Sequence, residues 1–188
     1  TDAAYFQSLI GIVRWMVELG RIDICLEVSM LSSHLALPRE GHLAQLFHMF
    51  AYLRKYHNTE MVFDPSDPTI DEDKFDRLDW TSSEFGHVDG QEEIPRNAPE
   101  PRGMGFVMSA KVDADHASDT TTRRSRTGFL VFLNCAPIHW MSKKQTGVES
   151  SSFGSEFVAM KQCCEYLRGL RYKLRMLGIP CEGPAYIF

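Results

Sequence analysis

The chain has 188 residues, of which 44% are hydrophobic and 24% charged, with a formal net charge of −5. This composition is typical of an ordinary globular protein and excludes disorder over the whole length. No apolar run reaches the roughly 18 residues of a membrane-spanning helix, so we expect no membrane segment. The first residues lack the basic and then apolar pattern of a signal peptide. They also lack an initiator Met, which suggests a fragment of something longer.

Five cysteines occur, with no CxxC pair and no regular spacing. A closed zinc site needs about four converging ligands. The sequence therefore favours free, buried thiols in a reducing compartment over a metal site or disulfides.

The charge is unevenly distributed. The stretch 64–100 holds twelve of the 25 acidic residues and only three of the 20 basic ones, so the rest of the chain is net positive. A uniformly basic nucleic-acid binder is excluded, but a modestly basic body can still bind a phosphate backbone locally.

The first sixty residues have helical periodicity. One run extends from Tyr5 to Leu19 with a stop at Gly20, a second covers 23–35, and a third covers 43–53. We expect them to pack as a small bundle. The apolar stripe predicted for the first run comprises Tyr5, Leu9, Ile12, Val13, Met16, Val17 and Leu19. A short strand is predicted at 61–63, and the Pro-rich acidic stretch 64–104 is interpreted as an extended linker or surface excursion.

Strand patterns begin at Gly105. Strands are predicted at 106–112, ending at Asp113, and at 128–133 and 138–142, as an antiparallel meander. Ser151 or Ser152 caps a long helix that closes at Gly178, and a fourth strand begins at 185. The predicted stripe of this helix comprises Phe157, Met160, Cys163 or Cys164, Leu167, Leu170 and Leu174.

Two carboxylates lie at positions suited to a two-metal nuclease. Asp113 ends the first strand, and Glu156 lies in the first turns of the long helix. Carboxylates from separate elements can hold paired divalent cations, and their hard oxygen ligands suit Mg²⁺. The same residues could instead be solvated carboxylates at a strand end and a helix N-terminus, where Glu is favoured by the helix dipole.

Four ordered motifs resemble Ty1/copia-type retrotransposon polyproteins. V-D-A-D-H-A-S-D at 112–119, followed by R-R-S-R-T-G-F at 123–129, resembles the family's D-A-D-W-A-G-D and R-x-S-T-S-G. P-I-H-W-M-S-K-K-Q at 137–145 resembles P-I-S-W-x-S-K-K-Q, and S-S-F-G-S-E-F-V-A-M at 151–160 resembles S-S-T-E-A-E-Y-x-A-L. In the helical part, Y-F-Q-S-L-I-G at 5–11, R-I-D-I at 21–24 and Y-L-R-K at 52–55 are similar to Y-R-S-L-I-G, R-P-D-I and R-Y-L-K.

The resemblance implies an α/β protein. Residues 1–63 would be a thumb or connection segment of reverse transcriptase, 64–104 an acidic linker or insert, and 105–188 a ribonuclease H-like domain cut short in its fourth strand. By resemblance, the parent protein would copy RNA into DNA and cleave the RNA strand of RNA/DNA hybrids, inside cytoplasmic virus-like particles or in the nucleus. By resemblance, Asp113 and Glu156 hold Mg²⁺, and the side chains expected to follow the hybrid backbone are Arg123, Arg124, Lys143 and Lys144.

The chain also departs from the family pattern. His116 replaces Trp, Ser118 replaces Gly, and Phe153-Gly154 stands where the first Glu of E-A-E is expected. The third and fourth family carboxylates would come after Phe188. The alternative is therefore a catalytically dead, element-derived module with a structural, nucleic-acid-binding or protein-interaction role. Self-association through an uncovered sheet edge is also expected as a risk.

Several residues have plainer interpretations. Asp115 and Asp119 suit turns, Trp140 suits the core, and the paired serines 151 and 152 suit a helix cap rather than a nucleophile. The Arg and Lys residues near the motifs, Arg126 among them, could be solvated surface groups. The seven histidines show no spacing typical of metal ligands.

Overall fold

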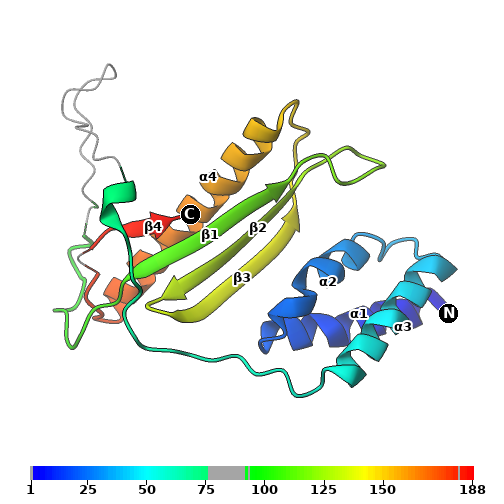
Figure 1. Ribbon diagram of the computed structural model, residues 1–188, viewed down its shortest axis with the longest axis horizontal. Coiled ribbons are helices and arrows are strands. Elements are labelled where there is room, and N and C mark those ends of the chain that lie inside the picture. The colour runs from blue at the N-terminus through cyan, green and yellow to red at the C-terminus, as the bar shows by residue number, and fades with distance from the viewer. Residues whose placement is uncertain (1, 76–91, 93, 182) are drawn as a thin grey trace.

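The computed structural model describes residues 2–75, 92, 94–181 and 183–188. A helical amino-terminal part is followed by a four-stranded mixed sheet with one long helix packed on it, an α/β fold as predicted (Figure 1). In the described parts no helix is both long and apolar enough to cross a membrane.

The helical part consists of α1 (Asp2–Glu18), η1 (Ile22–Ile24), α2 (Cys25–Ser32) and α3 (Glu40–Lys55), which confirms the three helical runs. The chain turns at Gly20, whose φ of +117° favours glycine. The helices share a core that contains Phe6, Ile10, Val13, Val17, Ile24, Val28, Leu31, Leu46, Met49 and Leu53.

The predicted stripe of α1 is partly wrong. Tyr5, Ile12 and Leu19 are exposed, whereas Phe6 and Ile10 are buried with the correctly predicted Val13 and Val17. At 3.6 residues per turn, positions 6, 10, 13 and 17 share one helical face, and positions 5, 12 and 19 lie on a neighbouring face. The second and third helices, which pack on α1, cover the first of these faces.

The sheet contains β1 (Met108–Asp115), β2 (Arg126–Leu133), β3 (Ala136–Lys144) and β4 (Ala185–Ile187), in the order β3-β2-β1-β4. The first three strands form the predicted antiparallel meander. Strand β4 lies parallel to β1, and backbone bonds of Phe188 to Ala110 and Val112 extend the pairing. The predicted strand at 61–63 is wrong, because these residues are extended without a partner strand among the described residues.

Helix α4 (Ser152–Met176) covers one face of the sheet (Figure 1). Ser151 caps it, since its Oγ accepts a hydrogen bond from Gly154 N at 3.1 Å, and Gly178 follows its end with φ +73°. The core beneath it comprises Met108, Ala110, Phe129, Val131, Cys163, Leu167 and Leu174. Phe157 and Met160 were wrongly assigned to the buried stripe, because they lie on the outer face, 54% and 41% exposed.

The helical part packs on the other face of the sheet. Trp140 of β3 contacts the helical core, which confirms its predicted burial against apolar residues. Ser29 Oγ donates to the Ser142 carbonyl oxygen at 2.6 Å and accepts from Arg126 at 2.6 Å. Side chains alternate along a strand, and Phe129 and Val131 face α4. Arg126 and the residues cross-strand from it therefore face the helices.

The described parts of the acidic segment contact the sheet and α4. Near its start, Asn134 Nδ2 donates to the Pro65 carbonyl oxygen at 2.8 Å. Beyond η2 (Glu72–Lys74), the ring of Phe75 packs edge-on against Tyr186 and Phe188. The ring of Phe75 thus covers part of β4, an edge strand of the sheet.

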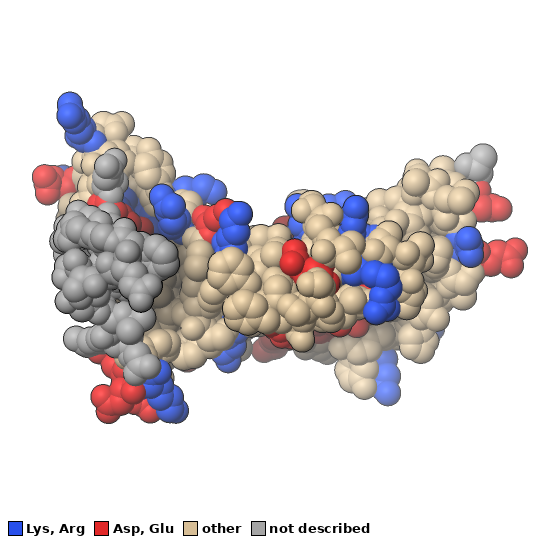
Figure 2. Space-filling model, turned by 90° about the horizontal axis from the view of Figure 1, so that it is seen from above, with Lys and Arg blue, Asp and Glu red and all other residues tan. Residues whose placement is uncertain are grey.

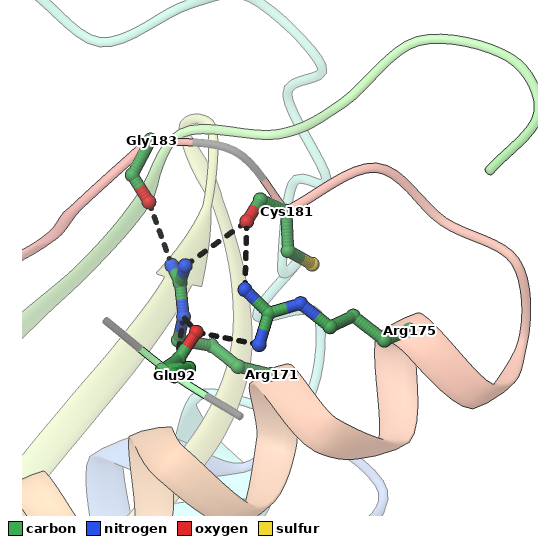
Figure 3. A network of polar contacts seen from close by, with 5 residues as sticks. All are labelled: Glu92, Arg171, Arg175, Cys181 and Gly183. Atoms are coloured by element: carbon green, nitrogen blue, oxygen red, sulfur yellow. Dashed lines mark hydrogen bonds and ion pairs between the residues drawn. The ribbon is translucent and has the colours of Figure 1, made fainter. Parts of the chain in front are cut away.

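A charged network holds the turn before β4 (Figure 3). Both carboxylate oxygens of Glu92 accept from Arg171 at 3.0 Å, and Arg175 forms a second ion pair with Glu92. The two guanidinium groups also donate to the carbonyl oxygens of Cys181 and Gly183. Residues from the acidic segment, α4 and the approach to β4 are thereby joined.

All five cysteines are free, as predicted. Cys163 is fully buried, and burial raises the pKa of its thiol to about 11. Cys164 is exposed, so the expectation of burial does not hold for every thiol.

Candidate active site

Asp113 lies within β1 rather than at its end, which corrects the predicted strand boundary. The ladder continues to Asp115, with Asp113 opposite Gly128 and Asp115 opposite Arg126. Strand β1 is central, flanked by β2 and β4. Asp113 is paired with β2, whereas the bonds of β1 on the β4 side end at Val112, which donates to Phe188.

Asp113 and Asp115 line a groove of about 380 Å³ between the sheet and the helical part. Ile22, Cys25 and Leu26 form the helical wall, and Arg126 and Trp140 belong to the sheet wall. The groove lies on the face of the sheet turned away from α4. Asp113 is exposed and takes part in no hydrogen bond or ion pair among the described residues.

Arg126 is the buried cation of this groove. It is 8% exposed, and burial lowers the pKa of its guanidinium, against the opposing effect of the negative charges of Asp119 and Asp115. The sequence left Arg126 as a solvated or nucleic-acid-contacting side chain. In the structure Arg126 instead donates a hydrogen bond to Ser29 Oγ, at the junction between the two halves of the chain.

Glu156 lies one turn into α4, is exposed, and directly follows Ser155, which is fully buried. No polar contact joins Asp113 and Glu156, and the described residues contain no group of three His, Cys, Asp or Glu placed to hold a metal ion. The elements that carry the two carboxylates nevertheless meet. His116 Nδ1, three residues after Asp113, lies 3.2 Å from Ser155 Oγ.

The four predicted nucleic-acid-binding residues have different environments. Arg123 is exposed with a φ of +56°, Arg124 is half-buried, and Lys143 is exposed at the end of β3. Lys144 is not free, because its Nζ forms a 2.8 Å ion pair with Asp119. Figure 2 shows basic and acidic side chains interspersed on one face of the molecule, so contacts to a phosphate backbone would be local.

Asp119 organises the loop after β1, which confirms it as a turn residue. It accepts from Lys144 and from the backbone N–H groups of Thr121 and Thr122. The hydrogen bond from Lys144, followed by the one from the Thr122 backbone, holds the pKa of this carboxyl well below its usual range. Asp115, by contrast, is the last residue of β1 and not a turn residue.

Sequence reasoning missed the role of Gln145. Its side chain is 2% exposed and bridges β2 and α4. The K-K-Q motif marked the position, but no local pattern indicated burial, because the residue follows two lysines and precedes a loop.

Comparison with known proteins finds Pol polyproteins of plant transposons. The chain is 24% identical over 188 residues, its whole length, to the retrovirus-related Pol polyprotein from transposon RE1 of Arabidopsis thaliana. It is 23% identical over 174 residues, 93% of the chain, to the corresponding polyprotein from transposon TNT 1-94 of Nicotiana tabacum. An 87-residue stretch, 46% of the chain and 6% of the relative, is 36% identical to the polyprotein from transposon RE2 of Arabidopsis thaliana.

The chain spans about 10% of the length of the RE1 and TNT 1-94 polyproteins. No family model matches it. No solved structure matches it significantly. The ordered motifs, the α/β fold and the full-length alignment all indicate the same relationship to these polyproteins. The chain is homologous over its full length, at low identity, to Pol polyproteins of Ty1/copia-type retrotransposons.

Proposed function

We propose that this chain is the ribonuclease H-like region of a Pol polyprotein together with adjoining reverse transcriptase helices. Its activity would be Mg²⁺-dependent hydrolysis of the RNA strand of an RNA/DNA hybrid. The observation that carries the proposal is the fold order: a three-stranded meander, a long helix and a fourth strand parallel to the first, with Asp113 on the central strand and Glu156 in the first turns of the helix.

The two carboxylates suit Mg²⁺ by their chemistry, while Asp113 lines the groove on the side of the sheet turned away from α4 and Glu156 lies on α4 itself. Both are exposed, and neither forms a hydrogen bond or ion pair with any other described residue, so their oxygens are available to a hard cation. Asp113 and Glu156 would hold Mg²⁺. When bound, paired ions in such nucleases activate the attacking water and stabilise the leaving oxygen.

The basic side chains would position the substrate. Arg123 and Arg124 lie in the loop between β1 and β2, and Lys143 is the residue before the last of β3. Each phosphate contact of this kind makes binding depend on salt. Lys144 would contribute less, because its charge is compensated by Asp119.

The test is cleavage of an end-labelled RNA/DNA hybrid with Mg²⁺. The experiment compares this chain, a form extended past Phe188, and the variants Asp113→Asn and Glu156→Gln. Asp67→Asn is the matched control, an exposed carboxylate outside the motifs. We expect cleavage that is lost in Asp113→Asn and Glu156→Gln and kept in the control.

Absence of cleavage in both folded forms would overturn the enzymatic proposal. Hybrid binding measured at several salt concentrations then distinguishes the remaining roles. Salt-dependent binding without cleavage would identify a nucleic-acid-binding module, and its absence would leave a structural or interaction module.

A further inference from the structure

Gln145 is a buried residue directly after β3 that forms hydrogen bonds to several elements. Its Nε2 donates to Thr127 Oγ1 at 3.1 Å and to the Ser155 carbonyl oxygen at 2.9 Å. Its backbone N–H donates to the Ser125 carbonyl oxygen at 2.8 Å. One side chain thus links the start of β2 to the first turn of α4.

The turn after β1 joins the same cluster. Ala117 N donates to Ser125 Oγ at 3.0 Å, and His116 Nδ1 lies 3.2 Å from Ser155 Oγ. Ser125, Thr127 and Ser155 are each fully buried. The cluster therefore fixes the segment just beyond Asp113 against the residue just before Glu156.

Stability alone does not account for a glutamine at this position. Gln145 Oε1 is buried and has no hydrogen-bond partner among the described residues. A buried acceptor without a partner is unfavourable, and a side chain selected for stability alone would not leave one. Directed hydrogen bonds, however, fix a position and an orientation that apolar packing does not specify.

We propose that Gln145 is a positioning residue that sets the first turn of α4, and hence Glu156, relative to β1 and Asp113. A role for Gln145 in catalysis rests on the proposed function. Its role in placing the first turn of α4 does not, so the catalytic role and the structural placement can be tested separately.

The variant Gln145→Met keeps the side-chain length and removes the amide. Gln7→Met is its matched control, since Gln7 Nε2 also donates to a carbonyl oxygen, that of Leu35, but at an exposed site. Amide hydrogen exchange is measured along the folded chain. We expect exchange to accelerate about tenfold in 114–118 and 152–158 in Gln145→Met only, with no change in α3. Unchanged exchange in these two segments would overturn the proposal.

If Gln145→Met fails to fold, Thr127→Val takes its place, with Thr127→Ser as the control that keeps the hydroxyl. Thr127→Val removes one of the two acceptors of the amide, and we expect a smaller acceleration in the same two segments. No acceleration in the folded Thr127→Val chain would overturn the proposal.

The second measurement is the Mg²⁺ dependence of hybrid cleavage. We expect the Mg²⁺ midpoint of Gln145→Met to rise about tenfold, with activity restored by excess metal, as when the support of a metal ligand is lost. A merely structural residue would leave this midpoint unchanged in the folded fraction, and that result would overturn the proposal. Absence of cleavage in the unaltered chain would overturn only the proposed function, because the exchange measurement still decides the placement.

Discussion

Trp140 Nε1, on β3, donates a 3.0 Å hydrogen bond to the carbonyl oxygen of Val17, near the end of α1. The two residues are 123 positions apart, and the indole ring also packs against the core of the helical part. A side chain of the sheet therefore completes the core of the helices. The two halves of the chain are packed together rather than tethered.

We expect Trp140→Ala to lower the free energy of unfolding by about 3 kcal/mol, because it leaves a cavity at the junction and removes the hydrogen bond from the indole to the Val17 carbonyl oxygen. Trp140→Phe should cost about 1 kcal/mol, since the ring remains and the hydrogen bond is lost. Urea denaturation followed by circular dichroism measures both. Trp15→Ala is the control, because Trp15 is 65% exposed, and its effect should be within about 0.5 kcal/mol. Equal effects at the two tryptophans would contradict the packing described here.

The Asp119–Lys144 ion pair should contribute to the free energy of unfolding at neutral pH, and this contribution should be lost in acid. The folded-state pKa of Asp119 lies below its unfolded value, so the contribution is fully present above about pH 4 and disappears as pH falls through the folded pKa. Asp119→Asn should cost about 1 kcal/mol at pH 7, and the difference should shrink below about pH 4. Denaturation midpoints from pH 7 to pH 3 test this, with Asp67→Asn as the control. A gap between wild type and variant that stays constant in acid would argue against the pair.

Glu92 should stabilise the approach to β4. Burial alone would raise the pKa of Glu92, but hydrogen bonds and charge from Arg171 and Arg175 outweigh it and lower the pKa. Glu92→Gln should therefore cost about 1 kcal/mol near neutral pH, a difference that decreases below about pH 4.5. The local effect should be faster amide exchange in the 179–187 stretch. Glu60→Gln, an exposed carboxylate outside the network, is the control, and the same exchange in both variants would refute the role of Glu92.

Stability should also fall in acid through His139, but at a higher pH than through the carboxylates. Its ring stacks on Tyr166 at 4.0 Å, and burial lowers the pKa of the imidazole, against a smaller opposing effect from Glu18. The unfolded chain binds this proton at about pH 6.5, before the folded chain does. Stability should therefore fall as pH drops below about 6.5 and level off below the folded pKa, by at most about 1.4 kcal/mol per pH unit.

His139→Phe keeps an aromatic ring against Tyr166 and removes the titrating group. We expect its free energy of unfolding to vary less between pH 7 and pH 5 than that of the unaltered chain. Chemical denaturation at each pH measures the two slopes, and His57→Phe, at an exposed site, controls for the loss of a histidine. Parallel slopes for His139→Phe and the unaltered chain would rule out this contribution.

The ordered motifs were sufficient to identify the family, and periodicity was sufficient to place the three helical runs, the meander and the capped helix α4. These features depend on residues close in the chain, such as the Ser151 cap with Gly154 three residues later. The apolar residues of α1 and α4 were recognised as well. Which of them are buried was predicted only in part, because both helices carry apolar residues on more than one face.

Local patterns by themselves thus determined the element types and revealed the homology to Pol polyproteins, and they proposed two candidate carboxylates. Only the tertiary structure decided that Trp140 completes a helical core, that Arg126 is bound to Ser29 across 97 residues, and that Gln145 ties β2 to α4. The physical reason is that burial and hydrogen-bond partners are properties of elements brought together from distant parts of the chain. A period of 3.6 or 2 residues specifies a face, but the element that covers that face comes from elsewhere in the sequence.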